Sequence, residues 1–153
     1  MTTGFNNTPP DSERRNYTSW GRTRQPKNLA GGVHGSEITP VLNGDPTALA
    51  ADEQPKAGYA TESQRYLQMY FHESADVEKT VTVYGYVYAF KKWFILQDNA
   101  GANVVWAVKN STETKNGANA IDISGIDRLY FSTDEAFVAN DEFYAAVNTI
   151  SVK

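Results

Sequence analysis

The run from Lys79 to Phe90 (KTVTVYGYVYAF) constrains the fold of this chain more than any other feature of its sequence. Every second residue from Val81 to Ala89 is small or β-branched, and the positions between them carry Thr, Tyr or Phe. Because successive side chains of a β-strand point to opposite faces, this period of two predicts one long strand with a core-facing side. β-Branched and aromatic residues also favour strands over helices.

Six further segments carry shorter strand signals, and polar or glycine-containing turns separate them. The predicted strands are 65–72, 79–90, 93–97, 103–109, 120–124, 126–132 and 142–152. Asp98–Gly101 is expected to turn the third strand into the fourth as a hairpin, since glycine accepts a positive φ angle. Residues 110–117 are expected to form a polar loop. With no long amphipathic helix, the pattern predicts an all-β fold, a compact antiparallel β-sandwich or small barrel of about seven strands.

The first 58 residues have a different composition. They hold all six prolines and only three aromatic residues, and their apolar residues follow neither strand nor helix spacing. Such a segment buries too little apolar surface to offset an ordering cost of about 1–2 kcal/mol per residue. We therefore expect an extended Pro/Gly-rich N-terminal arm over residues 1–58 and an antiparallel β domain over 59–153. A short helix is expected at 46–52, with Asp45 as its N-cap.

Charge is also divided unevenly along the chain. The formal net charge is −4, yet residues 1–30 hold five basic and two acidic residues, against nine and sixteen in the rest. Arginines mixed with Tyr and Trp suit an interface with a protein, and also stack on single-stranded nucleic acid. The run is short and irregular, so the protein interpretation is favoured and nucleic acid is not expected. The residues predicted to bind a partner are Phe5, Arg14, Arg15, Tyr17, Trp20, Arg22 and Arg24.

Few residues are available for catalysis. The absence of cysteine excludes disulfides, thiolate metal sites and thiol chemistry. Neither His34 nor His72 lies in a nucleophile, phosphate-binding or metal-binding motif. The acidic pairs at 134–135 and 141–142 are read as solvated side chains rather than calcium ligands. We expect no enzymatic activity, no cofactor and no metal, and neither a membrane-spanning segment nor a secretory signal.

The second face of the 79–90 strand carries Tyr84, Tyr86 and Tyr88 in a row, followed by Phe90. These rings fit three interpretations: a second buried layer formed by cross-strand packing, an exposed contact face for a protein partner, or a platform for sugars. A sugar-binding interpretation also extends to Trp93 and Trp106. The residues alone leave these alternatives open.

The arm, the small tyrosine-rich β domain and the lack of cysteine and of a catalytic set together resemble the small structural proteins of tailed bacteriophage virions. The similarity is greatest to capsid decoration, or cement, proteins. It implies a non-enzymatic virion protein whose arm lies along neighbouring major capsid subunits while the β body sits on the shell, with homo-oligomers expected in the assembly. Tail, collar and head-fibre components share this layout, and a carbohydrate-binding β-sandwich is the alternative from another class.

Overall fold

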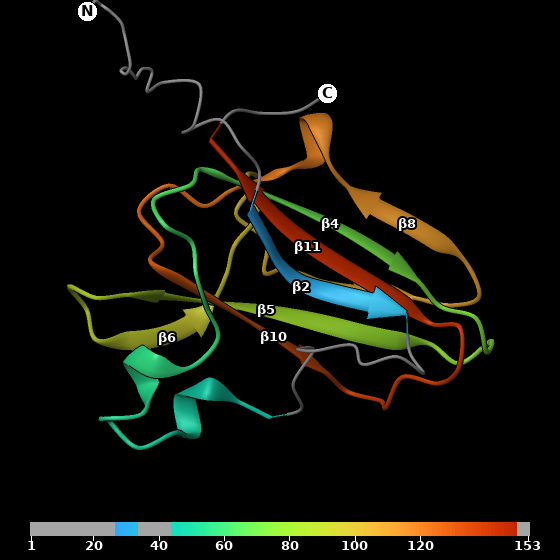
Figure 1. Ribbon diagram of the computed structural model, residues 1–153, viewed down its shortest axis with the longest axis horizontal. Helices are drawn as coiled ribbons and strands as arrows, with labels where there is room; N and C mark the ends of the chain where they lie inside the picture. Colours follow the sequence, from blue (N-terminus) through green and yellow to red (C-terminus); the bar gives the residue numbers. More distant parts are fainter. Residues whose placement is uncertain (1–26, 34–43, 150–153) are drawn as a thin grey trace, which may run out of the picture.

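The structure, a computed structural model, describes residues 27–33 and 44–149 (Figure 1). These residues form two antiparallel five-stranded sheets with only single turns of 3-10 helix between strands. The all-β fold expected from the sequence is confirmed. The described residues hold ten strands rather than about seven, because several edge strands are too short to show a period of two.

The first sheet is built around β5 (Lys79–Val87), which has β10 (Arg128–Thr133) on one side and short strands on the other. Beyond β10 lies β3 (Tyr59–Ala60). On the opposite side, β6 (Lys92–Ile95) pairs with the end of β5 and β7 (Val105–Val108) pairs with its beginning. β6 and β7 therefore form one edge strand that is interrupted in the middle.

The second sheet repeats this plan around β4 (Tyr66–His72), which pairs with β11 (Glu142–Asn148). β2 (Lys27–Val33) lies outside β11. On its other side, β4 pairs with β8 (Thr112–Lys115) and, at its beginning, with β9 (Ile121–Asp122). The edge of this sheet is interrupted as well, at a turn of 3-10 helix.

Three 3-10 turns occur among the described residues: η1 (Pro46–Ala48), η2 (Gln54–Lys56) and η3 (Gly117–Asn119). η1 begins where the sequence predicts a helix, and Asp45 accepts a hydrogen bond from the Thr47 amide at 2.9 Å. The helix is shorter than predicted, because Leu49 returns to extended backbone. η3 separates β8 from β9 and forms the interruption in the second sheet.

The core fills the space between the two sheets. Alternate residues of β5, Val81 and Val83, are fully buried, as the period of two predicts. They meet Leu67 and Phe71 of β4 and Phe131 of β10 in one apolar cluster. Phe143 packs edge to face on Phe71 of its own sheet and on Phe131 of the other sheet, a geometry that suits the quadrupoles of the rings.

Two of the predicted connections differ from the structure. The hairpin of 93–97 with 103–109 exists only at its tip, where Gln97 bridges Asn103. Its two strands separate because nine-residue β5 is long enough to pair with both of them end to end. The predicted polar loop 110–117 contains β8, whose residues are mostly exposed and so show no hydrophobic alternation. That part of the prediction was wrong.

The first 58 residues contribute to the β domain wherever the structure describes them. Residues 27–33 form β2, and residues 44–58, here called the covering segment, pack on the outer face of the first sheet. The predicted boundary between residues 58 and 59 therefore falls inside the described β domain. The remaining parts of the predicted arm, residues 1–26 and 34–43, lie outside the described residues.

Candidate functional site

The tyrosine row divides into a covered part and an exposed part. Tyr86 is 2% exposed and packs with Trp93 and Tyr130 beneath the covering segment, while Tyr84 is partly buried beside them. The Trp93 indole donates a hydrogen bond to the Gln54 carbonyl at 2.8 Å. Most of the row thus forms a second buried layer, and Trp93 and Tyr86 offer no open platform for a sugar.

Burial also raises the pKa of several tyrosine hydroxyls. Burial, and next the charge of Tyr130, raises the pKa of Tyr59 to about 12. Burial, together with the nearby Asp45 carboxylate, raises the pKa of both Tyr84 and Tyr130. These hydroxyls therefore stay neutral across the physiological range.

Arg128 fastens the covering segment to the sheet. Its Nε donates to the Ala57 carbonyl at 2.7 Å, and its Nη2 donates to the carbonyls of Gly58 at 3.0 Å and Lys56 at 3.3 Å. Gly58 has a φ of +67°, and a Cβ there would lie 2.1 Å from the Leu129 carbonyl oxygen. Sequence reasoning missed this clamp, although a lone arginine within the apolar run IDRLYF was a signal for it.

The exposed part of the row lies in the turn between β5 and β6, residues 88–91, here called the hairpin tip. Tyr88 is 49% exposed and Phe90 is 64% exposed. The Tyr88 amide donates to Asp127 Oδ2 at 2.8 Å, which fixes the base of the turn. Of the predicted contact face Tyr84, Tyr86 and Tyr88, only Tyr88 is freely accessible, and Phe90 joins it.

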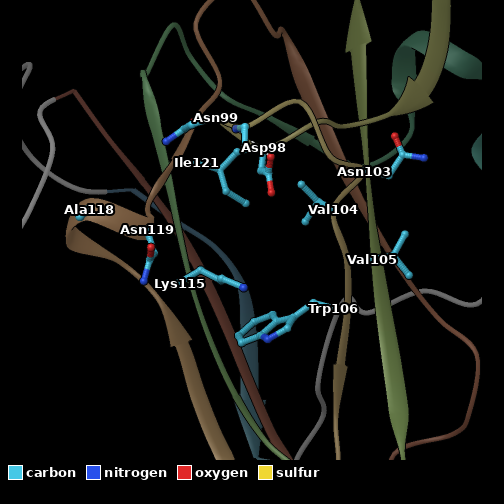
Figure 2. A pocket seen from close by; sticks show the side chains of 11 residues that line it. Asp98, Asn99, Asn103, Val104, Val105, Trp106, Lys115, Ala118, Asn119 and Ile121 are labelled. Atoms are coloured by element: carbon cyan, nitrogen blue, oxygen red, sulfur yellow. Dashed lines mark hydrogen bonds between the residues drawn. The ribbon is translucent and has the colours of Figure 1, made fainter.

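A cleft of about 290 Å³ lies where the edge strands of both sheets are interrupted (Figure 2). The loop between β6 and β7 forms one wall, and η3 with the adjoining strands forms the other. Figure 2 shows the Asp98 carboxylate and the Lys115 ammonium group directed toward the same central space, with the Trp106 indole beside Lys115. Buried Val104 and Ile121 supply apolar lining.

Side-chain hydrogen bonds hold both walls of the cleft. Oδ1 of Asp98 accepts from the amides of Ala100 and Ala102, each at 2.9 Å. Asn99 crosses from one wall to the other, since its Nδ2 donates to the Ala120 carbonyl and its Oδ1 accepts from the Asp122 amide. The cleft is therefore formed by loops that these hydrogen bonds hold in place.

Trp106 connects the cleft to the core. Its ring packs edge to face on Phe71 and is only 5% exposed. Its Nε1 donates to Glu113 Oε1 at 3.0 Å, and the Lys115 Nζ lies 5.5 Å from the ring centroid. Of the two tryptophans considered as sugar contacts, Trp106 borders a cleft and Trp93 does not.

A buried cluster of three charged residues, here called the charged triad, lies at the beginning of β5. Lys79 Nζ is 2.8 Å from Glu73 Oε2 and 3.1 Å from Asp141 Oδ2, and all three residues are at most 1% exposed. Glu73 also accepts from the amides of Ala75, Val77 and Asn110. The triad thus joins three loops and has its hydrogen bonds satisfied within the protein.

Hydrogen bonding sets the charge states of the triad. Burial by itself raises the pKa of Glu73, but hydrogen bonds from Lys79, Asn110 and Ala75 outweigh it and lower that pKa to about 2. The pKa of Asp141 is also lowered, because hydrogen bonds from Val138, Ser74 and Lys79 outweigh burial. The pKa of Lys79 is raised, since its two carboxylate partners outweigh the cost of burial. All three groups therefore stay charged near neutral pH.

The other sequence candidates are placed as follows. His72 Nδ1 lies 2.8 Å from the Thr112 hydroxyl at the paired ends of β4 and β8. Asp141 is a buried triad member rather than a solvated acid, and Asp134 accepts from the Thr80 amide at 2.8 Å. His34 and the predicted partner-binding residues lie outside the described residues; the latter are Phe5, Arg14, Arg15, Tyr17, Trp20, Arg22 and Arg24.

Within residues 27–33 and 44–149, no group of three or more His, Asp or Glu side chains is arranged to hold a metal ion. No helix in the same part of the chain is long and apolar enough to cross a membrane. Comparison with family models, with curated proteins and with solved structures finds no match to this chain.

Proposed function

We propose that this chain is a non-enzymatic structural protein of a virion, of the capsid decoration type, that binds a larger protein shell. The exposed hairpin tip carries this proposal. Tyr88 and Phe90 present apolar rings to solvent at the end of a turn that is fixed at its base. Aromatic side chains on a preorganised surface are typical anchors of protein interfaces, because they bury a large area at a small entropy cost.

The basic N-terminal residues supply the second contact in this proposal. Arg24 is followed by only two residues before β2 begins at Lys27, and β2 is the outer strand of its sheet among the described strands. A partner bound by residues 14–24 is therefore held close to this edge of the body. The partner is the major capsid protein or another virion subunit, and several copies of the chain occupy one particle.

Co-sedimentation tests the proposal directly. The chain is co-expressed with the shell-forming protein encoded in its genome of origin, and assembled shells are pelleted. We expect full-length protein in the pellet, strong loss after deletion of residues 1–26, and partial loss for Phe90→Ser. Val77→Ser is the matched control, since Val77 is 47% exposed near the opposite end of β5. The deletion stops before β2, so both sheets keep all their described strands.

Three results decide against the proposal or refine it. If full-length protein stays in the supernatant with intact shells, or if its genome of origin encodes no shell-forming protein, the decoration function is wrong. If deletion of residues 1–26 leaves sedimentation unchanged, the N-terminal contact is wrong. Electron microscopy of labelled particles then separates the shell from the tail, collar or head fibre as the place of attachment.

A further inference from the structure

We propose that the cleft between the interrupted edge strands is a saccharide-binding site that holds one neutral sugar unit. The inference is independent of the virion function, because it rests on residues that the hairpin tip and the N-terminal segment do not include. It follows from the size of the cleft, the pairing state of its polar groups and its apolar lining.

Size restricts the ligand to a small one. Pockets for small molecules measure roughly 300–1,000 Å³, and the cleft of about 290 Å³ stands at the lower limit of this range. It is partly open to solvent and lies between the loop that follows β6 and the turn η3. One ring of a longer chain can therefore enter while its neighbours remain in solvent.

Polar groups in the cleft are left with free hydrogen-bonding capacity. Oδ1 of Asp98 is used by the turn, whereas Oδ2 receives no hydrogen bond from any described residue. The Lys115 ammonium forms no ion pair within the described chain and contacts only the Trp106 ring. Figure 2 shows both charged groups facing the same space. An acceptor and a donor are thus presented together without being paired to each other.

This arrangement favours a neutral ligand with several hydroxyl groups. The Asp98 carboxylate repels a free anion that Lys115 attracts. In the same way, the Lys115 ammonium group repels a free cation that Asp98 attracts. A sugar hydroxyl donates to a carboxylate and accepts from an ammonium group, so one ring can satisfy both. Such charge-assisted hydrogen bonds are stronger than neutral ones.

A sugar ring also has an apolar face of C–H groups, and the apolar lining of the cleft suits this face. Val104, Ile121 and the Trp106 indole supply this lining. Since Trp106 is 5% exposed and Lys115 lies over its ring, a sugar meets the accessible edge of the indole rather than stacking on its whole face. Because Asn99 ties the two walls together, little ordering cost remains for binding.

Nuclear magnetic resonance titration of the full chain tests this inference. Glucose, galactose, mannose and N-acetylglucosamine are added separately, and backbone amide shifts are followed. We expect at least one sugar to shift the resonances of residues 98–104 and 115–121, and the Trp106 indole resonance, while those of the hairpin tip stay in place. Sodium acetate at equal concentration serves as the anion probe.

Two substitutions remove the proposed contacts without disturbing the turn. Asp98→Asn keeps Oδ1 as the acceptor for the loop amides but replaces Oδ2, and Lys115→Met keeps the length of the side chain without its charge. Each is expected to weaken binding about tenfold or more. Asp76→Asn and Lys109→Met are the controls, since both residues are exposed outside the cleft lining, and they should bind like the parent.

Three outcomes overturn the proposal. The first is that none of the four sugars shifts the cleft resonances. The second is that acetate alone shifts them, which makes the cleft an anion site. The third is that a sugar binds but the two cleft variants and the two controls retain equal affinity, which places the sugar elsewhere.

Discussion

The two ends of β5 reverse the usual distribution of polar and apolar groups. At its beginning, the charged triad is excluded from solvent, whereas just beyond its end the hairpin tip exposes Tyr88 and Phe90. Each charge of the triad finds its partner within the chain. Tyr88 and Phe90 of the tip are instead 49% and 64% exposed. The charged groups at one end of β5 thus interact within the fold, whereas the aromatic rings at the other end remain accessible to a partner.

The largest effect is expected from Lys79→Met. It leaves the Glu73 and Asp141 carboxylates buried near each other without their cation, and breaking a buried ion pair costs about 3–5 kcal/mol. Urea unfolding of the variant and parent measures the difference in free energy of unfolding. Lys109→Met, which changes an exposed lysine, should stay within about 0.5 kcal/mol. Equal stability of Lys79→Met and the parent would show that the triad does not hold the three loops.

The next largest loss of stability is expected from Gly58→Ala, which changes the covering segment near the end of β5 that carries the hairpin tip. The added Cβ would lie 2.1 Å from the Leu129 carbonyl oxygen, at a φ angle of +67° that alanine adopts poorly. The covering segment must then move away from Trp93, and we expect the free energy of unfolding to fall by about 2–3 kcal/mol. Gly101→Ala is a useful control, because its φ is also positive but no atom lies within 4 Å. A red shift of tryptophan fluorescence in Gly58→Ala alone would mark exposure of Trp93.

Acid should lower the free energy of unfolding through the charged triad at the beginning of β5. The expected loss is similar to that from Gly58→Ala. The pKa of Glu73 is about 2 in the folded protein and 4.5 when unperturbed, so its contribution is present above pH 4.5 and is lost as pH falls toward 2. The loss is about 3 kcal/mol at one pKa unit per 1.4 kcal/mol. Thermal unfolding between pH 6 and pH 3 should show the larger part of this loss, about 2 kcal/mol, because the rest falls between pH 3 and pH 2. The Lys79→Met variant should lose much less over this interval, and an identical acid response in both proteins contradicts the assignment.

Alkali acts on the buried tyrosines with the opposite sign. The pKa of Tyr59 is raised from 10.0 to about 12, so its stabilising contribution is present below pH 10 and is lost as pH rises through 12. Ultraviolet absorbance should therefore show a late-ionising tyrosine class in the folded protein. Denatured protein should titrate in a single step near pH 10. A single step in the folded protein would mean that Tyr59 is open to solvent.

The smallest effect on stability is expected from Phe90→Ser. Phe90 is 64% exposed, so its substitution should change the free energy of unfolding by no more than about 0.5 kcal/mol. Combined with reduced co-sedimentation, this result would sharpen the contrast between the two ends of β5. A large loss of stability would instead assign Phe90 to the fold.

Sequence patterns predicted the strands that alternate and missed the features that depend on distant residues. The strand at 79–90 was found because Val81 and Val83 repeat on one face. Lys79 occupies the same face, but nothing local indicates that Glu73 and Asp141 surround it. β8 was missed because an exposed edge strand needs only backbone pairing, for which its side chains give no signal.

The candidate site could be predicted only in part for the same reason. Tyr84, Tyr86 and Tyr88 were named together as one possible contact face, but the cover over Tyr86 comes from residues about thirty positions earlier. Trp106 was named as a sugar contact, yet the cleft beside it exists because two separate edge strands are interrupted side by side. Asp98 was assigned to a turn, and its unused oxygen becomes visible only once the loop closes.

The interrupted edges also affect how copies of this chain can lie together. Unpaired backbone on a long edge strand recruits strands from other molecules and leads to aggregation. Here β6, β7, β8 and β9 are each two to four residues long, and loops project between them. This side of the molecule offers no continuous template for another strand. Copies that meet along this side therefore cannot join their sheets. In contrast, seven-residue β2, which is the outer strand on the other side of its sheet among the described strands, is long enough to pair with an added strand.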